Sequence, residues 1–182
     1  MSSEKLQDKV LILKARLGDK NAFGSIYNKY INKIYRFAFY KTSSKEIAED
    51  ITSQTFLKLW EIIAHGGQIK TLQALLYQIT RNLIIDHYRS KHNTEVPLEF
   101  ELDSQAIHID EKIHSKIDNE LLRPAVMLLK EEYREIIILR YIEDLSITEI
   151  AKIIDKTNGN VRTLTHRALN ELKLILKDHN IE

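Results

Sequence analysis

The side chains best suited to sequence-specific hydrogen bonding lie together near the carboxyl end of the chain. Polar residues recur on one side of a helical pattern that runs to residue 172. Arginine can bond guanine at two points, asparagine can bond adenine, and threonine can contact a phosphate or the methyl group of thymine. This chemistry predicts contact with the major groove of DNA. The candidate residues are Thr157, Asn158, Asn160, Arg162, Thr163, His166 and Arg167.

Two short helical patterns with a break between them position these side chains. The first has apolar residues at i, i+3, i+4 and i+7 from Ile147, and Ser146 and Glu149 form the capping box that starts a helix. The second repeats the apolar spacing from Val161 to Leu172, with a cap expected from the residue at 157. This arrangement is typical of a helix-turn-helix and makes gene regulation the leading hypothesis.

An ordinary helical hairpin with a solvated polar face remains the alternative for this stretch. Asp155 stands where such turns commonly have glycine, and Lys156 stands where a small apolar residue is common. The turn therefore departs from the usual pattern more than the two helices do.

The composition describes a globular chain of one or two small domains. Hydrophobic residues make up 43% and charged residues 29% of its 182 residues. Cysteine is absent, which excludes disulfides, thiolate metal sites and cysteine nucleophiles. The sequence shows no signal-peptide pattern and no uncharged apolar run of about eighteen residues. We expect a cytoplasmic protein without redox chemistry.

Helical spacing dominates the first half of the chain, so we predict an all-α fold. One helix ends at Gly18 and a second follows Asp19. A third opens with a capping box at Ser43 and Glu46. It ends at residues 65–67, and a fourth begins near residue 71 with Arg81, Asn82, Asp86 and Arg89 on its outer side.

Charge divides the chain into three parts, although the net charge is only +1. Residues 1–91 hold 15 basic and 8 acidic side chains, a net +7. Residues 92–120 hold 2 basic and 8 acidic side chains, a net −6, whereas residues 121–182 hold ten of each. We predict two small helical domains, 1–91 and 121–182, joined by an acidic linker whose second half can begin a helix near Ile109.

The acidic linker repels DNA and would help keep the two domains on separate sites, although a merely solvated tether explains it equally well. Near-neutral overall charge argues against strong autonomous DNA binding, because that affinity scales with the phosphates neutralised. We expect the chain to need a larger partner to bind DNA well.

The two halves together resemble the extracytoplasmic-function group of bacterial sigma factors in the sigma-70 family. In residues 20–91 the resemblance rests on AEDITSQTFLKLWE and on LLYQITRNLIIDHYRSK. In residues 121–176 it rests on YREIIILRYIEDLSITEIA followed by VRTLTHRALNEL. The motifs occur in the order and at the separation that the family shows.

The resemblance implies a specificity subunit without an active site, metal, cofactor or small-molecule substrate. It would bind core RNA polymerase and direct it to promoters. The first motif would dock on the coiled coil of the largest polymerase subunit, and Phe56 fits the core slightly better than the interface. The predicted core-binding residues are Asp50, Gln54, Phe56, Leu57 and Trp60.

The second motif would recognise and melt the promoter −10 element, and the carboxyl-terminal helix-turn-helix would bind the −35 element. The loop from Ala64 to Lys70 would receive a base flipped out of the stack, which needs apolar walls and nearby cations. For Asp86 and Arg89 a surface ion pair is the alternative, worth about 0.2–0.5 kcal/mol. The predicted −10-binding residues are Lys70, Asn82, Asp86, Arg89 and Lys91.

The family resemblance also implies an anti-sigma factor as a partner. Two positions depart from the family pattern, since Leu75 replaces a frequent tryptophan and Lys130 a frequent proline. A metal site at His87 and His92, or at His108 and His114, lacks the helical H-E-x-x-H spacing. The remaining alternative function is an autonomous helix-turn-helix regulator, although residues 1–91 lack the alternating strands of a receiver domain.

Overall fold

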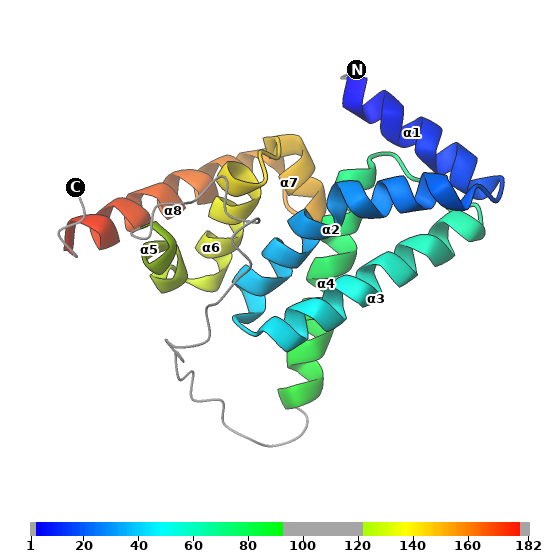
Figure 1. Cartoon of the computed structure of the whole chain (residues 1–182). Helices are drawn as coiled ribbons and strands as arrows, with labels where there is room; N and C mark the ends of the chain where they lie inside the picture. Colours follow the sequence, from blue (N-terminus) through cyan, green and yellow to red (C-terminus); the bar gives the residue numbers. More distant parts are fainter. Residues whose placement is uncertain (1–2, 93–121, 179–182) are drawn as a thin grey trace.

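The computed structural model describes residues 3–92 and 122–178, and these residues are almost entirely helical (Figure 1). Within these residues, four α-helices form an N-terminal bundle, and four further α-helices with one π-helical turn form a C-terminal group. The N-terminal elements are α1 (Ser3–Arg16), α2 (Lys20–Thr42), α3 (Lys45–Ala64) and α4 (Leu72–His92). The C-terminal elements are α5 (Leu122–Leu128), α6 (Glu131–Ile137), the π-helical turn η2 (Ile138–Ile142), α7 (Ile147–Ile153) and α8 (Asn158–Asp178).

The predicted all-α fold is confirmed within these residues, which contain no strand. The predicted helix near Ile109 and the acidic linker lie outside the described residues. Within the described ranges, no helix is both long enough and apolar enough to cross a membrane.

The N-terminal bundle is built on the apolar stripe of α2, which α3 and α4 cover. Ile26, Ile34 and Phe37 are fully buried, and the Phe37 ring packs edge-on against Tyr77 of α4 at 5.2 Å between centroids. The hydroxyl of Tyr30 donates to Asp8 of α1 at 2.6 Å, so α1 is fixed to the same core.

Capping residues place the ends of these helices. The Asp19 side chain accepts hydrogen bonds from the backbone N–H groups of Asn21 and Ala22, which starts α2 where the sequence predicted. The predicted capping box at Ser43 and Glu46 is wrong, because Ser44 is the N-cap of α3 and accepts from the backbone N–H of Ile47. Ser43 instead ends α2 in the left-handed region, at φ 54°, where the chain reverses direction.

The helix-turn-helix forms as predicted. Ser146 and Glu149 make the capping box of α7, and the Thr157 hydroxyl accepts from the backbone N–H of Asn160 at the start of α8. Asp155 has φ 52°, so the position where such turns commonly have glycine adopts the left-handed backbone that favours glycine.

A buried carboxylate joins the two helical groups. The guanidinium of Arg36 donates from Nε and Nη2 to Oε1 of Glu143, at 2.8 and 2.7 Å. The hydroxyl of Tyr77 donates to Oε2 at 2.6 Å, and the Glu143 side chain has no exposed surface. Burial, followed by the Glu143 carboxylate, raises the pKa of Tyr77 still further above neutral pH, so the phenol is protonated and donates to Glu143.

Further ion pairs surround this contact. Arg81 of α4 donates from Nε to Glu135 at 3.0 Å. The ammonium of Lys41 donates to Glu131 at 2.9 Å and lies 3.8 Å from the carboxylate of Glu135. That hydrogen bond holds the pKa of Glu131 below its usual value, so its contribution is complete above the unfolded-state pKa and is lost as the pH falls through the lowered folded-state value.

We predict opposite stability changes at the two adjacent serines. Ser43→Gly should raise the free energy of unfolding by about 0.5–1 kcal/mol, because glycine adopts a positive φ without the cost that a Cβ carries. Ser44→Ala should lower it by about 1 kcal/mol through loss of the cap. Urea denaturation of both variants and of the unchanged protein measures these two changes in the free energy of unfolding. A larger loss at Ser43 than at Ser44 would show that the cap lies one residue earlier.

Candidate nucleic-acid and polymerase interfaces

The polar face of α8 is free of contact with the protein core. Val161 and Ala168 are fully buried, which turns the intervening polar positions outward. The Thr163 hydroxyl is satisfied by the carbonyl of Gly159, and the amide of Asn170 lies 3.3 Å from Nδ1 of His166. The predicted −35-binding residues Asn158, Asn160, Arg162, Thr163, His166 and Arg167 are all exposed.

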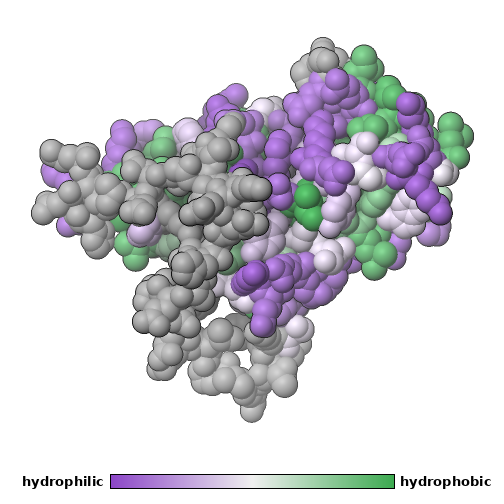
Figure 2. Space-filling model, in the orientation of Figure 1, coloured by the Kyte–Doolittle hydropathy of each residue, from purple (hydrophilic) through white to green (hydrophobic). Residues whose placement is uncertain are grey.

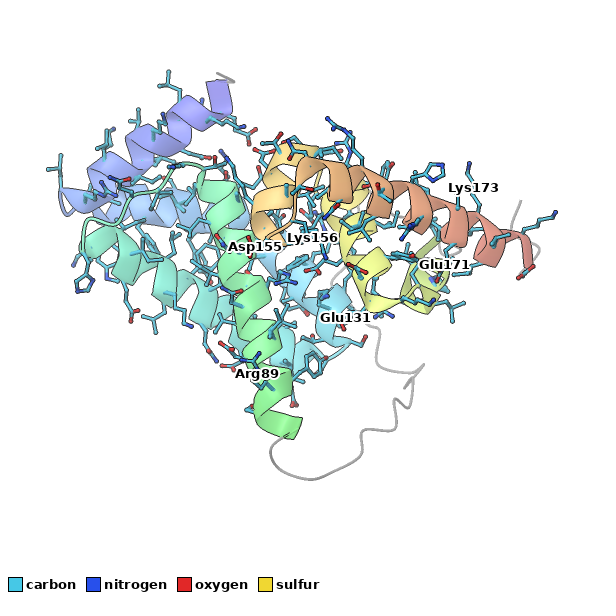
Figure 3. The ribbon with its side chains drawn as sticks, turned by 180° about the vertical axis from the view of Figure 1, so that it is seen from behind. Arg89, Glu131, Asp155, Lys156, Glu171 and Lys173 are labelled. Atoms are coloured by element: carbon cyan, nitrogen blue, oxygen red, sulfur yellow. The ribbon has the colours of Figure 1, made fainter. Side chains whose placement is uncertain are left out.

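A second polar stripe lies on α4. Asn82, Asp86 and Arg89 are exposed at i, i+4 and i+7, so their side chains share one helical face. Arg89 lies toward the carboxyl end of α4, away from the C-terminal helices (Figure 3). Lys91 lies within α4, but its side chain is outside the described residues. Arg81, which the sequence placed on the outer side, is instead half-buried against Glu135.

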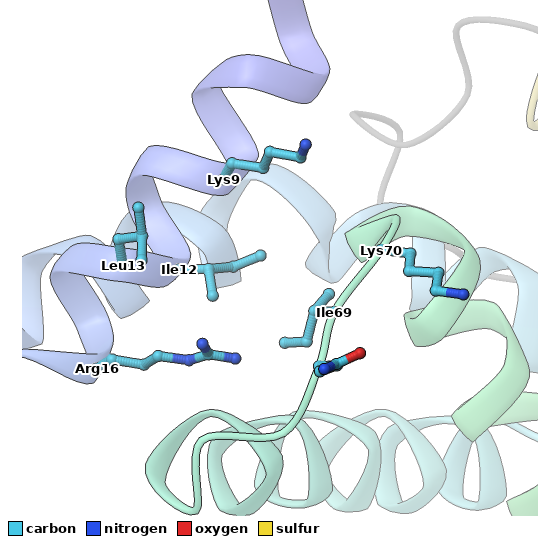
Figure 4. Close-up of a pocket in the computed structure, with 7 residues that line it drawn as sticks. Lys9, Ile12, Leu13, Arg16, Ile69 and Lys70 are labelled. Atoms are coloured by element: carbon cyan, nitrogen blue, oxygen red, sulfur yellow. The ribbon is translucent and has the colours of Figure 1, made fainter.

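The loop between α3 and α4 lines an open pocket together with α1. The pocket has a volume of about 460 Å³ and is lined by Lys9, Ile12, Leu13, Arg16, Gln68, Ile69 and Lys70. Arg16 and Ile69 point toward one another across the hollow, and Ile12 lies above them in this view (Figure 4). The pocket therefore combines apolar walls with cationic side chains.

Contacts with α1 and α3, together with two glycines, determine the shape of the α3–α4 loop. The guanidinium of Arg16 donates to the carbonyl of Gly67, which ties the loop to α1. Gly66 has φ 74°, a conformation that favours glycine. A Cβ at Gly67 would lie 2.7 Å from Cγ2 and 3.0 Å from the carbonyl oxygen of Ile62, so this position has no room for a side chain.

The exposed side of α3 carries a mixed polar and apolar surface. The amide of Gln54 donates to Asp50 at 2.7 Å, one turn apart on that side. Leu57 is 60% exposed and Trp60 is 37% exposed, with the indole edge-on to Phe23 at 5.0 Å. Phe56 is buried, as the preference for the core predicted, and packs against Tyr27. Phe56 therefore supports this surface from beneath.

Exposed apolar side chains are concentrated at the end of the molecule formed by α1, α2 and α3. The hydrophobic colour is visible there in the space-filling view (Figure 2). Leu6, Leu13 and Leu17 of α1 are more than half exposed. Large exposed apolar areas are characteristic of protein-binding surfaces.

Two kinds of contact were missed by sequence reasoning. Nothing in the sequence indicated that α1 lines the pocket, because Arg16 and Gly67 are 51 residues apart. The ion pairs of Arg36 and Arg81 with the C-terminal group were also missed.

Within the described residues, no three His, Cys, Asp or Glu side chains are arranged to hold a metal ion.

Two separate stretches of the chain match descriptions of one protein family. Residues 26–94 match sigma-70 region 2, and residues 120–172 match sigma-70, region 4. These stretches contain the exposed faces of α3, α4 and α8.

Individual relatives agree with these matches. The ECF RNA polymerase sigma factor SigM of Bacillus subtilis is 30% identical over 152 residues, covering 82% of this chain and 92% of SigM. The ECF RNA polymerase sigma factor BldN of Streptomyces coelicolor is 33% identical over 172 residues, covering 92% of this chain but 65% of BldN. The chain thus spans about two thirds of the length of BldN.

A solved structure shows the same fold. The sigma factor RpoE of Bartonella quintana, solved in complex with the anti-sigma factor NepR, has a TM-score of 0.70 and 25% identity, covering 85% of this chain and 96% of RpoE. The chain belongs to the sigma-70 family, in its extracytoplasmic-function group. Between the two functions that the sequence left open, this result selects a sigma factor over an autonomous regulator.

We predict that Gly67→Ala displaces the loop, because the new Cβ cannot fit beside Ile62. The free energy of unfolding should fall by about 1–3 kcal/mol, and the backbone amide signals of residues 65–71 and the Arg16 Nε signal should shift in NMR spectra. Gly24→Ala is the matched control. A Cβ at Gly24 meets nothing within 4 Å, so this change should stabilise α2 by about 0.5–1 kcal/mol. Equal changes in stability and in the NMR signals of the two variants would contradict the close approach of Gly67 to Ile62.

Proposed function

We propose that this chain binds core RNA polymerase through α3, contacts the promoter −10 element through α4 and the α3–α4 loop, and contacts the −35 element through α8. The observation that carries the proposal is the exposure of all three faces within the stretches that match the family. The N-terminal unit of the proposal covers residues 1–91 and the C-terminal unit residues 121–182.

Core polymerase is the partner that the α3 surface supports. A protein interface gains most affinity from a few apolar and aromatic anchors, and Leu57 and Trp60 are exposed anchors of this kind. The hydrogen-bonded pair of Asp50 and Gln54 provides a polar edge beside them. Phe56 positions this surface and makes no direct contact in the proposal.

Single-stranded promoter DNA is the ligand that the α4 face and the loop support. The pocket between α1 and the loop offers Ile12 and Ile69 as apolar walls for an unstacked base, and Arg16 and Lys70 as nearby cations. Asn82, Asp86 and Arg89 extend the same contact along α4, and Lys91 follows on the same helix. Base capture at the loop and strand contact along the helix together would hold the melted strand.

Double-stranded DNA is the ligand that α8 supports. The exposed arginine and asparagine side chains suit guanine and adenine edges in the major groove, and residues at the start of the helix suit phosphates. Arg162 and Arg167 are the strongest candidates for base contacts, whereas Thr157 and Asn158 lie at the helix start.

In this proposal the protein acts by binding alone. It does so in the cytoplasm, where bacterial polymerase and the chromosome are found. Members of the family do not catalyse a reaction, and the proposal includes no catalytic residue, metal or cofactor. By analogy with the RpoE–NepR complex, an anti-sigma factor is a further partner, and the exposed apolar positions of the two helical groups offer it a binding surface.

Run-off transcription with purified core polymerase tests the proposal. Fragmented genomic DNA from the source organism is transcribed with and without this protein, and the transcript starts are sequenced. New starts that share two upstream elements would support it. Binding of the protein to DNA without polymerase and without new starts would contradict it.

We predict that Arg162→Ala and Arg167→Ala reduce transcription from these starts without weakening polymerase binding. Loss of a base contact costs about 1–3 kcal/mol, so activity at limiting protein should fall about fivefold or more, and preference at one base of the −35 element should relax. Lys173→Ala, at an exposed position further along α8, is the control and should keep that preference. Loss of polymerase binding in either arginine variant would defeat the assignment.

We predict that Leu57→Ala and Asp50→Ala weaken binding to a coiled-coil fragment of the largest polymerase subunit. Truncation of an interface anchor costs about 1–2 kcal/mol or more, so the Kd measured by titration calorimetry should rise about fivefold to thirtyfold. Leu174→Ala makes the same change at a similarly exposed leucine, 62% against 60%, and should leave the Kd unchanged. Equal effects of both leucine changes would place the contact elsewhere.

A further inference from the structure

The packing of the two helical groups limits what the protein can contact at one time. The −10 and −35 elements are centred about 25 base pairs apart, which is roughly 85 Å at 3.4 Å per pair. Helices α4 and α8 each have 21 residues and both contact α7, and 21 residues span about 31 Å. Two such helices, each packed about 8–10 Å from the axis of α7, have their farthest ends within about 80 Å of one another, and most of their exposed faces lie closer than that. The two groups must separate before one protein contacts both elements.

The surface uncovered on the N-terminal bundle by this separation is cationic. Arg36 and Lys41 belong to α2, and Arg81 belongs to α4. In the packed arrangement their partners are carboxylates of the C-terminal group, at Glu143, Glu131 and Glu135 respectively. Tyr77, one turn before Arg81, adds an aromatic hydroxyl to the same surface.

The opposing acidic surface depends on the π-helical turn η2. Glu143 follows this turn, and its backbone N–H donates to the carbonyl of Ile138, five residues earlier. One α-helical turn and one wider π turn together take up about eight residues, which is the separation of Glu135 and Glu143. Both carboxylates therefore contact the N-terminal bundle. Glu131, labelled in Figure 3, lies one turn before Glu135 and pairs with Lys41 of the same bundle.

Carboxylate and phosphate oxygens both accept charge-assisted hydrogen bonds from arginine and lysine. Arg81 also directly precedes Asn82, the first residue of the proposed −10 contact on α4. We propose that Arg36, Lys41 and Arg81 form a phosphate-binding surface for the single promoter strand, and that the carboxylates of α6 and η2 occupy it until DNA displaces them. This inference rests on the proposed function and adds competition between the C-terminal group and DNA.

The test begins with the separation of the two groups in the full chain. The chain has no cysteine, so Ser53→Cys on α3 and Asn170→Cys on α8, both exposed positions, accept one spin label each. Double electron–electron resonance then measures the distance between them. A single short distance is expected at low salt, and a longer one should appear on adding a 20-nucleotide oligothymidylate. A long distance without DNA at low salt would overturn the packed arrangement.

Two variants distinguish competition from a purely structural contact. Glu135→Gln and Arg81→Gln break the same ion pair, so both should increase the population at the longer distance. Their effects on oligothymidylate binding should be opposite. Glu135→Gln removes a competitor and should tighten binding about threefold or more, whereas Arg81→Gln removes a phosphate contact and should weaken binding and lower the log–log salt slope by about 0.7.

Glu132→Gln is the control. Glu132 lies on the same helix as Glu135 but pairs with Lys156 of its own helical group, so neither distance nor DNA binding should change. Changes of the same sign in Glu135→Gln and Arg81→Gln would overturn the competition. If the opposite signs are found but the protein starts no transcripts with core polymerase, the proposed function fails and the competition stands.

Discussion

The Glu143 carboxylate imposes the strongest constraint on this structure. Its side chain is fully buried, and among the described residues its two oxygens accept hydrogen bonds from Arg36 and Tyr77 of the other helical group. An isolated carboxylate in such a place would cost several kcal/mol, because the charge loses its hydration. The position of the two groups that pairs this carboxylate also forms the contacts of Arg81, Lys41 and Lys5 with the C-terminal helices.

Such contacts specify an arrangement more than they stabilise it. The attraction between buried charges is largely offset by the desolvation of both partners, so an interface rich in ion pairs can be well ordered and still separate at moderate cost. The polar edge from Glu131 to Glu143 differs in this respect from the cores, where Ile26, Phe37 and Leu59 are fully buried. Separation of the groups would hydrate charges on both sides and would leave the apolar packing within the N-terminal bundle in place.

The elements that the sequence predicted well are those set by local chemistry. Helical periodicity and the caps at Asp19, Ser146 and Thr157 placed the main helices, because each cap acts within three residues of itself. The cap at Ser43 was wrong for a reason that a local pattern does not contain. Two adjacent serines can each cap a helix, and the reversal of the chain after α2 decides which one does so by holding Ser43 at a positive φ.

Contacts between distant residues could not be predicted in this way. Arg16 reaches Gly67 across 51 residues, and Arg36 reaches Glu143 across 107. The outward faces of α4 and α8 follow from periodicity alone, so resemblance could identify the side chains suited to DNA. The shape of the α3–α4 loop depends on α1. Whether Arg81 is available to another partner depends on its ion pair with Glu135 of α6. Residue types therefore indicate what these surfaces can bind, whereas the distant contacts govern when the surfaces are accessible.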